Sequence, residues 1–382
     1  MSGRLLRLVG TACAATVAAQ AVLAPVPATA VPEPGARSVA GLLTDLQRLY
    51  REAERATEAY NATAEKLTRQ RAEAERLDAE LARARLSLHD SRGAAGRLAR
   101  QQYQNSSDLS PYLRLLMARD PQHALEQGHV IGRLAQKRAE TVGRLAGHEK
   151  RADELARRAR EALDRQLALA ERQQRERNDV RERLDEVEEL LASLTTEQLT
   201  ELSSIEKNGI AKAQERFMAS GALRSDQKPS REGERAVRFA LEQLGKPYRW
   251  GAEGPASYDC SGLTSQAWGH AGTRIPRTSQ EQWDRLERVP LGELRPGDLV
   301  VYFPEATHVA LYLGDGMVVQ APRPGSGVKV SPIAANPVLG AVRPDPGGEP
   351  LRQYTPPELP EGAMEGSDEA YYAPAAPETS IR

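Results

Sequence analysis

The hexapeptide Tyr258-Asp259-Cys260-Ser261-Gly262-Leu263 decides how the second half of this 382-residue chain is interpreted. Cys260 is one of two cysteines, and the other, Cys13, lies in an N-terminal segment with the features of a removable leader. Exported chains tend to pair their cysteines or to lack them, so a solitary thiol is more often retained for its reactivity. The alternative is an inert, buried cysteine that packs as a small hydrophobe.

The residues that follow Cys260 favour the reactive interpretation. Apolar side chains continue at helical spacing, at Leu263, Ala267 and Trp268. This spacing places Cys260 at or near the N-terminus of a helix. There the partial positive charge and the free N–H groups favour the thiolate and would stabilise an oxyanion beside it.

The N-terminus has the three parts of a secretory signal peptide. Arg4 and Arg7 precede an apolar run over 8–23, and Ala28-Thr29-Ala30 forms a cleavage signal of small residues. The apolar run is short for a bilayer span. The sequence therefore predicts a signal peptide over 1–30 and a secreted protein associated with the cell wall.

Net charge and histidine spacing bear on which ligands the chain binds. The chain has 52 Lys and Arg against 53 Asp and Glu, so its net charge of -1 gives no electrostatic argument for nucleic acid. His89, His123, His129 and His148 lie scattered without metal-ligand spacing. We expect no nucleic-acid partner, no metal site and no cofactor.

The first half is typical of long coiled-coil helices. From Leu42 to Leu98 apolar and small residues keep a 4-3 spacing between charged positions. A polar stretch over 105–111 stops the first helix, and Asp120-Pro121 starts a second heptad run. Two long helices joined by a turn predict an antiparallel hairpin over 38–217, with a parallel dimer as the alternative.

Composition sets the other boundaries. The apolar patch over 112–117 lies at the turn of the hairpin and is either a local cap or a contact with a partner or with the rest of the chain. A Gly-, Ser- and Pro-containing linker is predicted over 218–232. A compact domain over 233–344 follows, and the acidic, Pro-rich tail over 345–382 is expected to be disordered.

The order of elements in the compact domain predicts an α+β fold with an antiparallel sheet. A helix over 234–244 ends at Gly245, which is a favoured helix stop. Three strands are predicted, over 299–303, 308–313 and 317–320.

A thiol nucleophile needs a base within hydrogen-bond reach and a polar group that orients the base. The compact domain has two histidines, and His308 begins a strand, as a base held by a rigid sheet would. His270 is most simply a helix-end residue. Gln320 interrupts an apolar strand and is the candidate orienting group; the alternative is that it faces solvent on an edge strand.

The hairpin turn between the last two strands tests the role of Gln320. A strict two-residue Asp315-Gly316 turn would pair Gln320 with Leu311, on the face opposite His308. A three-residue loop with a bulge would pair Gln320 with Ala310, on the face of His308. If Gln320 orients His308, the loop must be bulged.

Five motifs of the second half resemble, in order, those of the NlpC family of bacterial cell-wall peptidases, which have a papain-like fold. The resemblance covers about 232–344. The motifs are Pro247-Tyr248-Arg249-Trp250-Gly251, Asp259-Cys260-Ser261-Gly262-Leu263, Pro276-Arg277-Thr278-Ser279, Leu294-Arg295-Pro296-Gly297-Asp298-Leu299 and His308-Val309-Ala310-Leu311-Tyr312-Leu313-Gly314.

The resemblance implies a cysteine endopeptidase that cuts peptidoglycan stem peptides, commonly between D-isoglutamate and a diamino acid. It assigns Cys260 as nucleophile, His308 as base, Gln320 as the third polar residue, Tyr248 to the oxyanion, and Asp259 with Ser261 to the substrate amine. The third residue is often histidine in this family, so Gln320 orients the base without sharing its charge. Ala252 also replaces a common second glycine.

The sequence supports two hypotheses from different classes. The first is a secreted peptidoglycan hydrolase in wall remodelling or cell separation, whose coiled coil regulates access to Cys260 and contacts a membrane or divisome regulator. The second is a non-catalytic coiled-coil adaptor that recruits or activates other wall hydrolases. An inert wild-type domain, with a Cys260→Ala chain that complements a deletion, would favour the second.

Overall fold

The computed structural model describes residues 38–104, 117, 120–224 and 227–364. The predicted signal peptide and residues 112–116 of the apolar patch lie outside these residues. Met117, the last residue of the patch, is exposed. Within the described part of the chain, no helix combines the length and the apolar character needed to cross a bilayer.

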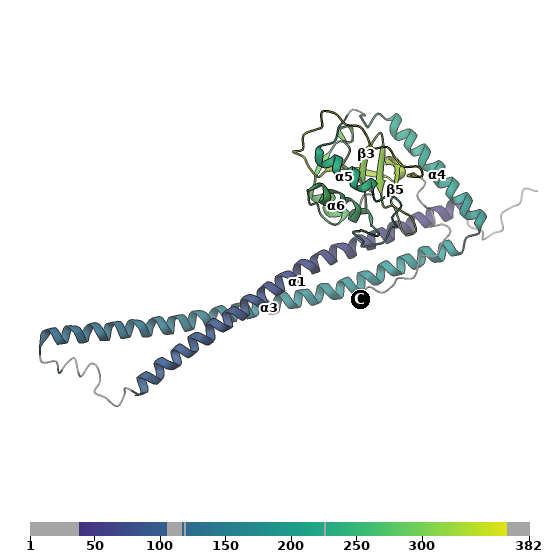
Figure 1. The fold of residues 1–382 in the computed structure, drawn as a ribbon. Helices are drawn as coiled ribbons and strands as arrows, with labels where there is room; N and C mark the ends of the chain where they lie inside the picture. Colours follow the sequence, from purple (N-terminus) through teal and green to yellow (C-terminus); the bar gives the residue numbers. More distant parts are fainter. Residues whose placement is uncertain (1–37, 105–116, 118–119, 225–226, 365–382) are drawn as a thin grey trace, which may run out of the picture. The chain divides into compact units, whose positions relative to one another are not determined.

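Two long helices form the predicted antiparallel hairpin (Figure 1). Helix α1 spans Val39–Gln104 and helix α3 spans Pro121–Ala192. Their direction follows from two contacts far apart along the helices, Glu52 with Arg183 and Ser91 with His148. Leucines and alanines of the 4-3 pattern form the seam: Leu77, Leu81, Ala84 and Leu88 of α1 with Ala152, Leu155 and Ala162 of α3.

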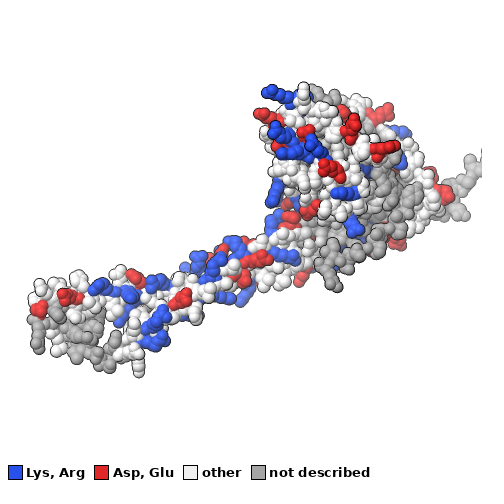
Figure 2. Space-filling view, viewed as in Figure 1, with Lys and Arg blue, Asp and Glu red and all other residues white. Residues whose placement is uncertain are grey.

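The exposed faces of the hairpin carry both signs of charge (Figure 2). Arg76 bonds Glu73 and Glu80 one turn to either side, and Arg172 bonds Glu176 in the same way. Such exposed pairs contribute little to stability but keep the surface solvated.

Helix α4, Thr196–Ala219, joins the hairpin to the compact domain and packs on both. It begins with a capping box in which Thr195 and Gln198 satisfy each other's backbone N–H groups. Its first turns bury Leu199 and Leu202 among leucines of α1. Near its end, Gln214 donates to the carbonyl of Gly316 (3.0 Å) and accepts from the N–H of Ala334 (3.1 Å).

The compact domain is α+β, as predicted, with a six-stranded antiparallel sheet in the order β1-β6-β2-β3-β4-β5. The strands are β1 Glu287–Val289, β2 Leu299–Tyr302, β3 His308–Gly314, β4 Met317–Gln320, β5 Lys329–Pro332 and β6 Val338–Arg343. The helices are α5 Arg231–Leu241, α6 Cys260–Ala271 and α7 Ser279–Arg285, with short 3-10 turns η2 Leu291–Glu293 and η3 Ile333–Ala335.

Both faces of the sheet are covered. Helices α5 and α6 cover one face (Figure 1). There Leu263 and Trp268 belong to the same buried apolar cluster as Val309 and Leu311. The other face forms a second apolar cluster that includes Phe217 of α4. Helix α4 is therefore part of the packing of the compact domain as well as a connection to it.

The turn between β3 and β4 has the bulged form. Leu311 pairs with Val319 and Tyr312 with Val318, and the register then shifts before Gly314 pairs with Met317. Continuing the regular pairing by one residue sets Gln320 opposite Ala310. The loop itself has two residues, Asp315-Gly316, but the bulge at Leu313 in β3 shifts the register. The register expected for a strict two-residue turn is therefore wrong, and Gln320 shares the face of His308.

Part of the C-terminal tail lies against the compact domain, which corrects the expectation of disorder for residues 345–364. Arg295 bonds the carboxylate of Asp345 (2.9 Å). The N–H of Leu351 donates to Pro229 O (2.9 Å), and the N–H of Val330 donates to Ala363 O (2.9 Å). The acidic composition did not predict these contacts, because most of them are made by backbone groups, which do not depend on residue type. Residues 365–382 lie outside the described part.

Candidate active site

Cys260 is the first residue of α6, as its spacing predicted. Asp259 is the N-cap, and its Oδ1 accepts the N–H of Gly262 at 2.6 Å. The cap holds the first turn in place, because a side-chain oxygen satisfies an N–H that has no partner within the helix. The N–H of Val309 also donates to the Cys260 sulfur.

His308 opens β3 and contacts Gln320 on β4. The distance from His308 Nε2 to Gln320 Oε1 is 2.6 Å. Because an amide oxygen only accepts, this hydrogen bond places the proton on Nε2 and leaves Nδ1 with its lone pair. Burial lowers the pKa of His308 to about 4, so the ring is neutral at pH 7, as a general base must be.

Replacing Gln320 by glutamate is expected to raise the pKa of His308 by about 1 to 3, because a carboxylate beside the ring favours the imidazolium. The measurement is a ¹⁵N NMR titration of the histidine rings. Gln320→Ala is the control and lacks this rise. An unchanged pKa in Gln320→Glu would separate Gln320 from the orientation of His308.

Tyr248 lies in the same apolar cluster as Cys260. Burial, and then the charges of Cys260 and Asp259, raise the pKa of its hydroxyl well above the usual value. The hydroxyl therefore stays protonated and keeps a hydrogen to donate.

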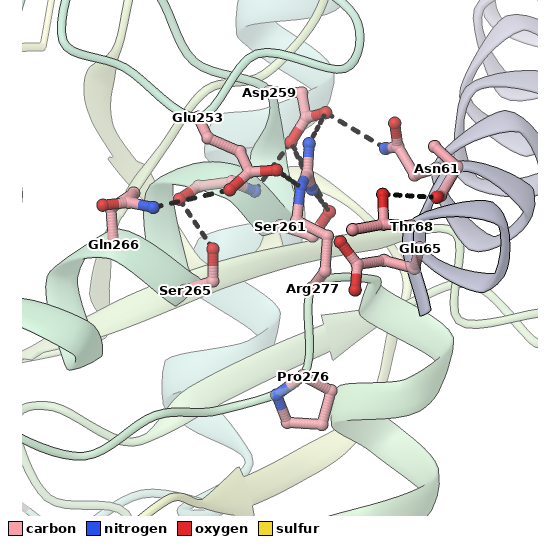
Figure 3. Close-up of polar contacts among 12 residues, drawn as sticks. Asn61, Glu65, Thr68, Glu253, Asp259, Ser261, Ser265, Gln266, Pro276 and Arg277 are labelled. Atoms are coloured by element: carbon pink, nitrogen blue, oxygen red, sulfur yellow. Dashed lines mark hydrogen bonds and ion pairs between the residues drawn. The ribbon is translucent and has the colours of Figure 1, made fainter. Parts of the chain in front are cut away.

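Arg277 joins the residues assigned to the substrate amine (Figure 3). Its guanidinium bonds both carboxylate oxygens of Asp259 (3.1 and 2.7 Å), the hydroxyl of Ser261 (2.9 Å) and Glu253 (2.7 Å). Arg277 thus holds the side chain of Asp259 in place beside Cys260. The sequence motif contained Arg277, but motif spacing alone gave it no role.

Helix α1 covers this site, which the sequence did not predict in residue detail. Glu58 Oε1 accepts from the hydroxyl of Ser261 (2.7 Å) and lies 3.8 Å from the sulfur of Cys260. Its Oε2 accepts the N–H of Ser279 (3.0 Å). Glu58 is 1 % exposed and Cys260 2 %. A carboxylate of α1 therefore occupies the space beside the thiol.

Two neighbours of Glu58 on α1 cover the rest of the site. Glu54 Oε1 lies 3.5 Å from His308 Nδ1, and His308 is 0 % exposed. Asn61 donates to Asp259 Oδ2 at 3.1 Å, the contact drawn from α1 in Figure 3. Glu54, Glu58 and Asn61 recur at i, i+4 and i+7, so this polar stripe on one helix face was the available signal.

Aromatic and cationic contacts hold α1 beside the site. Tyr60 meets Trp250 edge to face, with ring centroids 4.9 Å apart. Arg323, in the loop after β4, lies over the ring of Tyr50 (4.9 Å) and bonds Glu206 of α4 (2.8 and 3.2 Å). A single arginine of the compact domain thus touches both α1 and α4.

The covered site suppresses ionisation of the nucleophile. Burial raises the pKa of Cys260 well above its usual value, and the charges of Glu58, Asp259 and Glu54 raise it further. A thiolate is the reactive species, so the thiol is held in its inactive form. The helix N-terminus would favour the thiolate, but burial and the carboxylates outweigh that effect here.

The cysteine at the helix start and the histidine that a polar strand residue contacts both lie in a part of the chain that a family model matches. The sequence model of the NlpC/P60 family covers residues 245–340, which include Cys260, His308 and Gln320. The compact domain belongs to the NlpC/P60 family. Helix α1 and the hairpin lie outside the matched range, so the polar stripe that covers Cys260 is not part of the NlpC/P60 match.

Relatives of the NlpC/P60 domain include named endopeptidases. A "Probable endopeptidase" of Corynebacterium glutamicum is 46% identical over 89 residues, which are 23% of this chain and 43% of that one. "Peptidoglycan endopeptidase RipA" of Mycolicibacterium smegmatis is 37% identical over 114 residues, 26% of this chain and 23% of that one. The chain thus spans less than half the length of these curated relatives.

A solved structure of the NlpC/p60 domain of peptidoglycan hydrolase SagA is 31% identical. The match covers 29% of this chain and 97% of that one, with a TM-score of 0.28. The match is confined to the NlpC/P60 domain.

Proposed function

We propose that the protein is a secreted cysteine endopeptidase that cuts amide bonds in peptidoglycan stem peptides, between D-isoglutamate and a diamino acid. The observation that carries this proposal is the pairing of His308 with Gln320 at 2.6 Å, beside a thiol at the start of α6. Family membership and the printed activities of the relatives support it. Cell-wall remodelling or cell separation is the proposed setting.

The reaction follows from the roles of three side chains. His308 Nδ1 takes the proton of Cys260, and the sulfur attacks the amide carbon. The oxyanion that forms lies near the N-terminus of α6 and the hydroxyl of Tyr248. His308 then gives the proton to the leaving amine as the C–N bond breaks. A water, deprotonated by His308, attacks the thioester and releases the acid and the thiol.

Asp259 and Ser261 are proposed to bind the free amine of the substrate. Arg277 supports this assignment, because it bonds both oxygens of Asp259 and holds the carboxylate in place beside Ser261. The N–H donor of Asn61 stands where an amine of the substrate would donate.

Helix α1 is proposed to keep the enzyme latent until the helix moves. Glu54, Glu58 and Asn61 use the groups that the reaction needs, and no substrate reaches Cys260 while they are in place. A membrane or divisome regulator that contacts the hairpin is the proposed partner. This arrangement agrees with the access role expected of the coiled coil.

Digestion of purified peptidoglycan tests the proposed activity. The full chain is incubated with sacculi of defined stem peptide, and the soluble products are identified by mass. We expect products ending at D-isoglutamate, and none with Cys260→Ala. Cleavage that survives in Cys260→Ala would contradict the proposal.

The complete burial of Cys260 and His308 is the observation that favours the second candidate, a non-catalytic adaptor. In that case Cys260→Ala would restore a deletion strain as well as the wild type does. Loss of complementation in Cys260→Ala, with the protein present at wild-type level, removes the adaptor hypothesis.

A further inference from the structure

Two carboxyl groups of α1, one helical turn apart, lie buried in the active site, and no Lys or Arg among the described residues is shown bonded to either of them. Glu54 Oε2 is buried and has no hydrogen-bond partner among the described residues. Glu54 Oε1 is 3.5 Å from His308 Nδ1, which is a neutral nitrogen at pH 7. Glu58 is held by neutral donors, the hydroxyl of Ser261 and the N–H of Ser279.

Two of the cations near this pair bond other groups. The guanidinium of Arg277 donates hydrogen bonds to Asp259, Ser261 and Glu253. Arg323 is bonded to Glu206 of α4. The titratable and charged groups that face the pair are Arg51 on α1, Tyr248, Asp259 and Cys260 at the start of α6, Arg277 before α7, His308 on β3 and Arg323 after β4.

A buried carboxyl group without a bonded cation is stable in its neutral form, because burial penalises the charge. Burial, and then the charge of Glu58, raises the pKa of Glu54 to about 8. Burial, and then the charge of Asp259, raises the pKa of Glu58 to about 7. Both residues would return towards the ordinary value of 4.5 on a solvated helix. Docking of α1 thus takes up protons.

We propose that α1 is a proton-linked plug, in which Glu54 and Glu58 dock over Cys260 in their protonated forms and leave the cleft as the external pH rises. This inference rests on the proposed function, since it describes the regulation of the same thiol. It adds a signal that acts on the covering helix directly, without a protein partner.

The pH window follows from the individual groups. The pKa values of Glu54 and Glu58 are raised on docking, so their contribution to docking is complete below pH 4.5 and is lost as pH rises to about 8. His308 acts in the opposite direction, because burial lowers its pKa from 6.5 to about 4 and α1 supplies part of that burial. Between pH 4 and pH 6.5, the proton that His308 loses on docking offsets at most one of the protons that the two glutamates take up. Above pH 6.5 it offsets none.

The release of α1 is therefore steepest between pH 6.5 and 8. Each proton taken up on docking changes the docking equilibrium tenfold per pH unit. Docking takes up two protons between pH 6.5 and 7, and one proton between pH 7 and 8. The docking equilibrium therefore changes by up to about a hundredfold across this window. Cys260 has the same sign at higher pH, because its pKa is also raised.

Alkylation of Cys260 by iodoacetamide in the full chain measures this release. Cys13→Ser makes Cys260 the single thiol, and mass spectrometry follows the reaction from pH 5.5 to 8.5. Glu54→Gln/Glu58→Gln is the neutral counterpart of the protonated pair and should stay docked at every pH. The ratio of the two rates at each pH removes the ionisation of the thiol itself.

We expect the ratio of the wild-type rate to the double-variant rate to rise at least tenfold between pH 5.5 and pH 8. Glu75→Gln, at an exposed position further along α1, should follow the wild type. A ratio that stays constant with pH would overturn the proposal, as would faster alkylation of the double variant at pH 5.5.

Failure of the plug and failure of the enzyme are distinguishable. Alkylation requires access to the thiol and no cleavage of peptidoglycan. A pH-dependent ratio in a chain that releases no muropeptide would support the plug and contradict the peptidase. A constant ratio in an active chain would contradict the plug and leave the peptidase standing.

Discussion

Substituting Glu58 by arginine is expected to raise the rate of muropeptide release by the full chain at least tenfold. The substitution removes the carboxylate that Ser261 and Ser279 hold, and it brings a second guanidinium towards Arg277. A buried, unpaired charge costs several kcal/mol, which exceeds what the remaining contacts of this turn contribute. Helix α1 should therefore leave the cleft.

The measurement is the rate of soluble product release from sacculi at fixed pH and enzyme concentration. Glu75→Arg makes the same change of charge on an exposed face of α1 and should leave the rate at the wild-type value. Equal rates for Glu58→Arg and the wild type would show that α1 does not limit access.

His308→Ala, made in the Glu58→Arg chain, is expected to lower cleavage by about 10² to 10⁴. The loss follows because no other described base lies in the position of His308 Nδ1. His270→Ala is the matched control: that ring stacks on Phe239 (4.2 Å) at the end of α6, outside the site. Thermal unfolding confirms that both variants fold. Comparable losses in both would remove His308 from the base role.

The local parts of the site could be predicted from the sequence because short-range rules determine them. A capped helix start set the place of Cys260, and strand alternation set the face of His308. The position of Gln320 depended on one turn, and the requirement that it meet His308 selected the bulged form. Each of these features involves residues that are close in sequence or adjacent in one sheet.

The covering of the site could not be predicted, because it joins residues about two hundred positions apart. Glu54, Glu58 and Asn61 lie off the seam of the 4-3 pattern, where charged residues usually face solvent. Because these three residues are polar, the sequence did not predict that they are buried. The partners that satisfy them, Ser261 and Ser279, become available when the compact domain has folded.

The contacts of α4 and of the tail have the same origin. Gln214 bonds backbone groups of Gly316 and Ala334, and backbone groups carry no sequence signature. Arg323 contacts Tyr50 of α1 and Glu206 of α4, although the sequence of its loop is typical of an ordinary Pro-rich turn. Hydrophobic periodicity predicted the elements, and polar tertiary contacts decided which of them cover the active site.

The central claim is that a reactive thiol lies under α1. The most direct measurement is the alkylation rate of Cys260 at pH 7 in the full chain carrying Cys13→Ser, compared with the same chain carrying Glu58→Arg. We predict slow modification of the first and at least tenfold faster modification of the second. Equal rates in the two chains would contradict the account.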